Sequence, residues 1–170
     1  MTDRAMATGH SRSLIRLGLA VAAIVMVLDQ ISKWWIITAV MQPPRVIEVT
    51  SFFNLVMAWN RGVSFSLFTH DAEFMPYVLV AVALGIVVFL LSWLRRADRA
   101  FLAFAIGMVI GGALGNVIDR LRFGAVADFL DFHVLGYHWP AFNVADTGIS
   151  VGVALIVIDG LFGRHEIGKN

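Results

Sequence analysis

The chain has 170 residues, of which 59% are hydrophobic and 15% charged, and its formal net charge at pH 7 is +1. An average soluble domain has about 25% charged residues, so this composition indicates an integral membrane protein, and the near-neutral charge argues against a nucleic-acid partner. The sequence contains no cysteine, which excludes disulfides, thiolate nucleophiles and cysteine-ligated metal sites.

Residues 14–39 are expected to form the first membrane-spanning helix. The stretch begins like a secretory signal, but no small-residue cleavage motif closes the apolar run, which continues through Asp29-Gln-Ile-Ser-Lys33 into Trp34. Asp29 and Lys33 are four residues apart, so on a helix they share a face and can form an ion pair. The alternative is a lysine whose amine extends to the membrane surface beside an incidental acid.

Residues 46–68 change character after Pro43-Pro44. Aromatic and β-branched residues are interleaved with polar ones, which predicts short strands in a small sheet outside the membrane. Within this segment, Trp59-Asn-Arg-Gly62 has the composition of a turn in which Asn60 and Gly62 supply positive φ angles. Such a sheet could also present its backbone to an extended peptide by strand addition.

Three further apolar segments, the first two of them without a charge, are long enough, or nearly so, to cross a hydrocarbon core of about 30 Å. They cover residues 75–94, 100–118 and about 143–162, and a loop is expected over 121–140 between the last two. The sequence therefore predicts one membrane domain over residues 1–170, an all-α protein with four transmembrane helices and a small extracytoplasmic sheet after the first helix.

Glycine recurs every fourth residue over 107–115 in the third of these spans. This spacing places the glycines on one stripe, where the backbone of a neighbouring helix can approach closely. Asn116, Asp119 and Arg120 continue roughly the same side at the end of that helix.

The distribution of arginine and lysine predicts the orientation. The side that would hold both termini and the turn at 95–99 carries Arg4, Arg12, Arg16, Arg95, Arg96, Arg99, Arg164 and Lys169 against Asp3, Asp98 and Glu166. Because cytoplasmic loops carry an excess of basic residues, both termini are expected in the cytoplasm. The sheet and the central acids are then expected at the extracytoplasmic surface.

Four acids stand at the ends of segments apolar enough to lie in lipid: Asp119, Asp128, Asp131 and Asp146. An ionised side chain in a membrane costs several kcal/mol, about 3 on insertion scales, so these acids are expected to be functional. Two carboxylates in a partly dry site share a proton, one acting as base toward water while the other donates to a carbonyl oxygen. Asp146 has a simpler alternative role, the stabilisation of a helix N-terminus.

The sequence lacks the motifs of two other classes of hydrolase. The sequence has no His-Glu-x-x-His for zinc and no Gly-x-Ser-x-Gly for a serine nucleophile. Aspartic-protease chemistry needs neither a metal nor a cofactor, and none is expected.

Five sequence blocks together resemble the lipoprotein signal peptidase (signal peptidase II) family. They are Asp29-Gln-Ile-Ser-Lys33, Asn60-Arg-Gly-Val-Ser-Phe65, Gly111-Gly-Ala-Leu-Gly-Asn-Val-Ile-Asp-Arg120, Val126-Ala-Asp-Phe129 and Pro140-Ala-Phe-Asn-Val-Ala-Asp146. The blocks occur in the family's order and spacing, and with the four spans they cover nearly everything except the two tails.

The resemblance implies a bacterial inner-membrane aspartic endopeptidase that removes signal peptides from prolipoproteins, cutting just before a cysteine that bears diacylglyceryl. It assigns the catalytic pair to Asp128 and Asp146, whereas the residue pattern alone leaves Asp119, Asp128 and Asp131 open. The implied partners are lipid-modified prolipoproteins and membrane lipid, and a monomer is expected.

Further positions match polar residues that line the family's substrate and inhibitor site: Asn60, Asn116, Arg120 and Asn143. Asp29 and Lys33 match its first-helix polar pair. Amides can hydrogen-bond an extended peptide backbone, and Arg120 can bind a carbonyl. Asp119 is interpreted as a structural partner of the adjacent Arg120.

Two other functions stay open. A small ion-coupled transporter would use intramembrane acids as a proton relay, but acids clustered at one surface and the lack of an inverted repeat argue against it. A non-catalytic scaffold would use the glycine stripe to pack partner helices, and it predicts that the aspartates tolerate replacement by asparagine.

Overall fold

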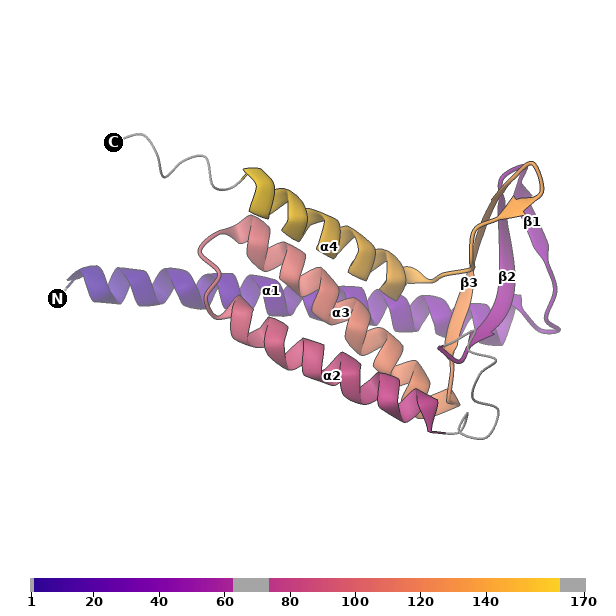
Figure 1. Cartoon of the computed structure of the whole chain (residues 1–170), viewed down its shortest axis with the longest axis horizontal. Coiled ribbons are helices and arrows are strands. Elements are labelled where there is room, and N and C mark those ends of the chain that lie inside the picture. The colour runs from indigo at the N-terminus through magenta and orange to yellow at the C-terminus, as the bar shows by residue number, and fades with distance from the viewer. Residues whose placement is uncertain (1, 63–73, 163–170) are drawn as a thin grey trace.

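A computed structural model describes residues 2–62 and 74–162, with the backbone alone for residues 2–11. The helices are α1 (Thr2–Trp35), continued by the π-helix η1 (Ile36–Val40), α2 (Met75–Leu94), α3 (Ala100–Phe123) and α4 (Val144–Phe162). The strands are β1 (Ile47–Thr50), β2 (Phe53–Asn60), β3 (Val126–Val134) and β4 (Tyr137–His138), which form one antiparallel sheet in the order β1-β2-β3-β4. The sheet lies across one end of the helix bundle (Figure 1).

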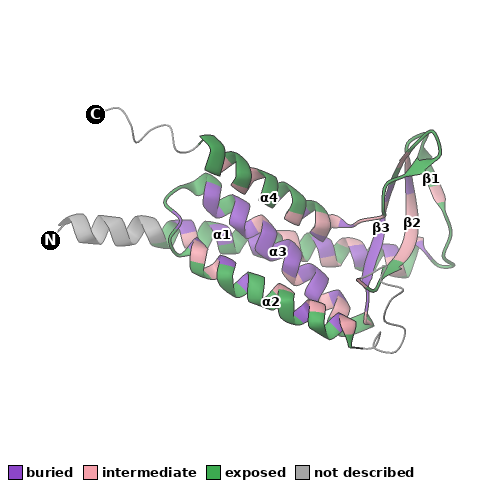
Figure 2. Cartoon of the chain, in the orientation of Figure 1, coloured by how far each residue is buried: buried purple, intermediate pink, exposed green. Residues whose placement is uncertain are grey.

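Four of the described helices are long and apolar enough to cross a membrane, the first of them over Arg12–Val40. Helix α3 lies at the centre of the bundle, because 72% of its most apolar window is buried, against 28% or less for the other three. Figure 2 shows α3 largely buried between neighbours whose outer faces are exposed. Those exposed faces are apolar, as expected where lipid is the solvent.

The glycine stripe on α3 packs against α1, as its spacing predicts. A Cβ added at Gly111 would lie 2.5 Å from the carbonyl oxygen of Ala22, and one at Gly107 would meet the backbone of Gly18. The absence of side chains therefore lets the two helix backbones touch. On another side of α3, Gly112 approaches the backbone of Ala145 at the start of α4.

The prediction of a loop over residues 121–140 is wrong, because most of this range is helix or strand. Helix α3 continues to Phe123 and ends at Gly124, whose φ of 68° is left-handed, and the chain then forms β3 and β4. Strand β3 pairs with β2 through Asn54↔Asp131 and Ala58↔Asp128, so the sheet is built from two separate parts of the chain and not only from the segment after the first helix. The first half of β3 is buried on both faces, which hides the alternation that normally indicates a strand.

The segment expected to form the sheet, 46–68, contains β1 and β2, and its residues 63–68 lie outside the described part of the chain. At the opposite end of the bundle lie the start of α1, the turn between α2 and α3, and the end of α4 (Figure 1). The polar residues named from the sequence are therefore concentrated at the sheet end.

Candidate active site

A layer of buried polar side chains lies where the helices meet the sheet. Its members come from α1, α3, β3 and the start of α4: Asp29, Lys33, Asn116, Asp119, Asp128 and Asn143. Asp146, which is half-buried, joins them through hydrogen bonds. Folding thus brings together residues that are more than a hundred positions apart in the sequence.

Lys33 is the centre of a buried ion cluster. Its Nζ lies 2.8 Å from Asp29 Oδ2 and 2.8 Å from Asp119 Oδ2. The predicted pairing of Asp29 with Lys33 is confirmed, and because Lys33 is only 2% exposed, the alternative of a lysine reaching for the membrane surface is excluded. We call Asp29, Lys33 and Asp119 the ion triad.

The predicted pairing of Asp119 with Arg120 is wrong, because Asp119 pairs with Lys33. Successive residues of an α-helix point in directions about 100° apart, so Asp119 faces α1 while Arg120 turns elsewhere. Nη1 of Arg120 donates to the backbone oxygen of Asn116 at 3.3 Å.

Gln30 is a member of this layer that the sequence reasoning missed. Its Nε2 donates to Asp119 Oδ1 at 2.9 Å and lies 3.2 Å from both Asp29 Oδ2 and the carbonyl oxygen of Gly115. An uncharged amide in an apolar helix gives no motif by itself, and only its position beside Asp29 could have indicated its role.

The ion triad also holds the two segments that carry the predicted catalytic acids. Asp119 Oδ2 accepts a hydrogen bond from the backbone amide of Ala127 at 3.1 Å, one residue before Asp128. Asp29 Oδ1 accepts one from the backbone amide of Ala145 at 2.9 Å, one residue before Asp146. Lys33 therefore links Asp119, which holds the start of β3, to Asp29, which holds the start of α4.

Asp146 and Asn143 form a reciprocal cap at the start of α4. Asn143 Oδ1 accepts from the Asp146 amide at 2.9 Å, and Asp146 Oδ2 accepts from the Asn143 amide at 3.3 Å. This is the pattern of a capping box, which satisfies two otherwise unpaired backbone donors. The capping role considered for Asp146 is thus present, but only one of its carboxylate oxygens takes part in it.

Amides hold the remaining carboxylate oxygens. Asn116 Nδ2 donates to Asp146 Oδ1 at 2.8 Å, and Asn143 Nδ2 donates to Asp128 Oδ1 at 2.6 Å. The Asn116 oxygen accepts from Lys33 Nζ at 3.0 Å and lies 3.4 Å from Asn143 Nδ2. Because Lys33 can only donate, it fixes the Asn116 amide with its nitrogen toward Asp146.

Asp128 has an unusual electrostatic environment. Burial raises its pKa from the ordinary 3.8 to about 6, and the nearby charge of Asp146 acts in the same direction. Hydrogen bonds from Asn60 and Asn143 and the charge of Lys33 oppose this shift without cancelling it. A carboxyl group with this pKa can hold or release a proton near neutral pH.

Asn60 reaches the site from the end of β2. It is the cross-strand partner of Val126, and its Oδ1 accepts from the backbone amide of Gly62 at 2.8 Å. Gly62 has a φ of 95°, as predicted, but Asn60 does not have the predicted positive φ. The turn therefore needs only the glycine, while the Asn60 side chain hydrogen-bonds Asp128.

A cavity of about 260 Å³ opens beside this layer, between α2, α3 and α4. Its walls are apolar and include Leu79, Val82, Ile86, Val109 and Ile149, and its polar lining residues are Asn116 and Arg120. Nε of Arg120 is buried and has no hydrogen-bond partner among the described residues. A free donor at the end of an apolar cavity can bind a carbonyl oxygen.

Asp131, the fourth acid, lies outside this layer. It projects from the opposite face of β3, where it is bound by Asn54 Nδ2 at 3.0 Å and by His138 Nδ1 at 2.9 Å. Burial raises its pKa, but the hydrogen bonds from His138 and Asn54 outweigh burial and lower it overall. Within the described residues, no three His, Asp or Glu side chains are grouped as metal ligands.

Comparison with known proteins places this arrangement in a family. The model of the family described as signal peptidase (SPase) II matches residues 21–162. A protein of Ralstonia nicotianae named lipoprotein signal peptidase is 46% identical over 145 residues, which make up 84% of this chain and 83% of the relative. One of the same name from Janthinobacterium sp. is 40% identical over 152 residues, covering 89% and 90%.

The fold is also similar to that of solved structures. A bacterial membrane enzyme determined by the in meso method at 2.3 Å resolution gives a TM-score of 0.75 at 29% identity, over 90% of this chain and 93% of that one. A second such structure, at 1.9 Å resolution, gives a TM-score of 0.74 at 30% identity. Sequence and fold agree over nearly the same length, and the chain belongs to the signal peptidase II family.

Proposed function

We propose that this protein is a membrane aspartic endopeptidase that removes signal peptides from diacylglyceryl-modified bacterial prolipoproteins, cutting just before the lipidated cysteine. The catalytic pair is Asp128 and Asp146. The observation that carries this assignment is that these two acids, unlike Asp29 and Asp119, are held mainly by neutral amides, one of which, Asn116, lines an apolar cavity. Membership of the signal peptidase II family supports the reaction and favours neither the transporter nor the scaffold.

The two acids share one proton in the active form. Asp128 is buried, and its pKa of about 6 suits it to carry that proton and donate it to the oxygen of the scissile carbonyl. Asp146 is half-exposed and is placed to take a proton from the attacking water. Asn116 and Asn143 hold the two carboxylates in register through the bonds described above, so the pair needs little reorganisation during the reaction.

The substrate enters sideways from the bilayer. The apolar cavity between α2, α3 and α4 accepts the helical signal peptide, and Arg120 and Asn116 at its end bind backbone carbonyls near the scissile bond. The acyl chains of the lipidated cysteine stay in the membrane, so the bilayer itself contributes to substrate binding.

The enzyme works as a monomer with one membrane domain over residues 1–170 in the bacterial inner membrane. Both termini lie in the cytoplasm and the active site faces the extracytoplasmic surface. Supporting this orientation, Arg95, Arg96 and Arg99 lie in or beside the turn between α2 and α3, at the end of the bundle opposite the sheet.

Cleavage of a diacylglyceryl-modified prolipoprotein by the purified protein in nanodiscs tests the proposal. Wild type, Asp128→Asn and Asp146→Asn are compared with a chelator present throughout, and an unlipidated substrate serves as control. Asp131→Asn is the matched variant, because it changes a buried acid on the same strand outside the site. We expect lipid-dependent cleavage that both site variants lose and Asp131→Asn retains. A folded wild type without activity would overturn the reaction, and an active Asp128→Asn would overturn the pair.

A further inference from the structure

The sheet has two chemically different faces at its projecting end. Cross-strand register places Phe53 opposite Phe132 on one face. On the other face, Asn54 lies opposite Asp131, and, two residues further along β3, His133 lies opposite His138. Because side chains alternate along a strand, β3 is apolar on one side and polar on the other over this stretch.

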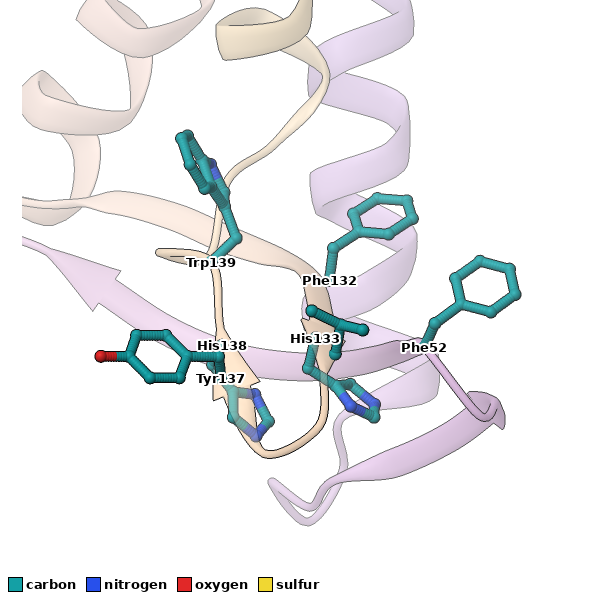
Figure 3. A pocket seen from close by; sticks show the side chains of 7 residues that line it. Phe52, Phe132, His133, Tyr137, His138 and Trp139 are labelled. Carbon is teal, nitrogen blue, oxygen red and sulfur yellow. The ribbon is translucent and has the colours of Figure 1, made fainter.

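The apolar face looks toward the start of α4, whereas Phe129, earlier on the other face, packs with Ile36 and Met41 at the end of the first span. Asp128 lies on the same face as Phe132 by alternation, and it bonds Asn143 at the start of α4. The ring of Phe132 stacks on Phe142, which directly precedes that start, with 5.8 Å between centroids. Figure 3 shows the rings of His133 and His138 on the side of the strands away from Phe132 and Trp139.

This end of the sheet extends sideways beyond α4, so part of its apolar face has no helix beneath it (Figure 1). The side chains there are large and exposed: Phe52, Val134, Leu135, Tyr137 and Trp139. All but Leu135 line a shallow hollow of about 350 Å³ together with Phe132 and the two histidines (Figure 3). We call these five exposed residues the apolar tip.

Leu135 is the most informative residue of the apolar tip. It and Gly136 form the two-residue turn between β3 and β4, with φ angles of 49° and 81°. Positive φ at both positions strongly favours Asn-Gly over a leucine. Leu135 is also fully exposed, so it serves neither the turn nor the protein core, and its apolar side chain needs another partner.

Aromatic residues on the helices show where the bilayer surface lies relative to this tip. Trp34 and Trp35 are exposed near the end of α1, and Phe74 and Tyr77 are exposed at the start of α2. Both positions are at the sheet end of the bundle (Figure 1). Such rings are typical of the membrane–water interface. The membrane surface is therefore expected to cross the helices near their sheet end, next to the projecting part of the sheet.

We propose that the apolar tip rests in the surrounding bilayer, at the boundary between headgroups and acyl chains, and anchors the free end of the sheet to the lipid surface. The opposite face, where Glu48 and His138 are exposed above the buried Asp131, remains on the water side. The lipid contact continues the apolar outer surface of the four helices onto the sheet. This inference rests on the membrane-spanning helices and does not depend on the proposed reaction.

Spin labels test the contact directly, because the natural chain has no cysteine and each label needs only one substitution. Leu135→Cys is compared with Glu48→Cys, an exposed residue whose cross-strand partner is Asn54 of the polar face. In lipid nanodiscs we expect the label at 135 to be severalfold more accessible to oxygen than to a water-soluble nickel complex, and the label at 48 to show the reverse. Equal access of the nickel complex to both labels would overturn the proposal.

A second variant separates the lipid contact from the turn. Leu135→Asn supplies the residue that the turn prefers, so the hairpin is retained while its apolar side chain is lost. With a label at Val134→Cys, we expect this change to shift accessibility from oxygen toward the nickel complex. Unchanged accessibility would overturn a role for Leu135 in the contact.

Discussion

The polar layer contains two pairs of carboxylates that are held in different ways. Asp29 and Asp119 each lie 2.8 Å from the same lysine and accept a backbone amide that anchors a neighbouring segment. Asp128 and Asp146 accept side-chain hydrogen bonds from asparagines. The first pair shares the positive charge of one lysine, whereas neutral amides orient the second pair.

Under the proposed mechanism, this difference separates structural acids from reactive ones. The four carboxylate oxygens of Asp29 and Asp119 bind Lys33, Gln30 or a backbone amide, so these two acids are occupied by contacts within the protein. The amides that bind Asp128 carry no positive charge, and burial raises the pKa of this carboxyl group to about 6. Lys33 connects the two pairs, since it also binds the Asn116 amide that orients Asp146.

The largest effect is expected from Lys33→Met. Removing the lysine leaves Asp29 and Asp119 buried without a cation, which costs about 3–5 kcal/mol in the free energy of unfolding. Cleavage should be lost as well, because both anchors of the acid-bearing segments weaken. Thermal unfolding in detergent micelles measures the change.

The matched control for that change is a triple variant in which Lys33→Met is combined with Asp29→Asn and Asp119→Asn. With the charges removed together, much of the lost stability should return. A Lys33→Met protein that melts like the wild type would show that the ion triad does not hold this layer.

Asp128→Asn should have the opposite effect on stability. Because the folded-state pKa is about 6 instead of 3.8, the folded protein binds this proton more tightly than the unfolded chain does. Wild-type stability therefore falls as pH rises from about 4 through 6. An asparagine carries no charge at any of these pH values, so it avoids the cost of burying an ionised carboxylate. It should therefore stabilise the protein by up to about 3 kcal/mol above pH 6 and have no effect below pH 4.

Unfolding midpoints of Asp128→Asn and wild type across this pH range measure the difference. A variant that is less stable than wild type at pH 8 would contradict the raised pKa. The expected combination, a more stable protein that cannot cleave, is the usual trade-off at an active site.

Asn116→Ala should reduce cleavage more than stability. Asn116 bonds both Lys33 and Asp146, and loss of the bond to Asp146 alone, worth about 1.5–3 kcal/mol for a charged group, corresponds to a fall of about 10–100-fold in kcat. KM should change less if the main role of Asn116 is to orient Asp146. Asn54→Ala is the matched control, because it removes another buried amide that binds an aspartate, Asp131, on the polar face. Equal losses of activity in both variants would argue against a positioning role.

The pH dependence of cleavage tests the shared proton. If Asp128 must be protonated, kcat/KM of the wild type should fall about tenfold per pH unit above a macroscopic pKa near 6. A rate that stays constant from pH 6 to 9 would assign the proton donor elsewhere.

Much of this organisation could be predicted from the sequence because the bilayer imposes simple rules. The span expected over 75–94 is the helix Met75–Leu94, since twenty uncharged residues in lipid have few alternatives to a helix. The pairing of Asp29 with Lys33 also follows from local spacing. Both predictions depend on residues within one helix.

The rest depends on contacts between distant segments. Nothing local distinguishes Asp119 from Asp128, yet one meets Lys33 of α1 and the other meets Asn143. The sequence of β3 resembles a loop because two acids interrupt its apolar pattern. Their hydrogen-bond partners lie in other segments: Asn54 in β2, His138 in β4 and Asn143 just before α4. The choice of Asp128 came from the family resemblance, and the amide network gives a physical reason for it.

Asp131→Asn should have the smallest effect, with a pH dependence opposite in sign to that of Asp128→Asn. The hydrogen bonds from His138 and Asn54 lower the pKa of Asp131 below its usual value, so its ionised form contributes stability above the unfolded-state pKa of about 4 and loses it as pH falls. Because the His138 side chain is 54% exposed, solvent screening limits this contribution to about 1 kcal/mol. The unfolding midpoint of the variant should therefore be slightly lower than that of the wild type at pH 7, and the difference should shrink as pH falls below about 4. A stabilised Asp131→Asn at pH 7 would mean that burial dominates on both faces of β3, and the contrast between its two aspartates would then be lost.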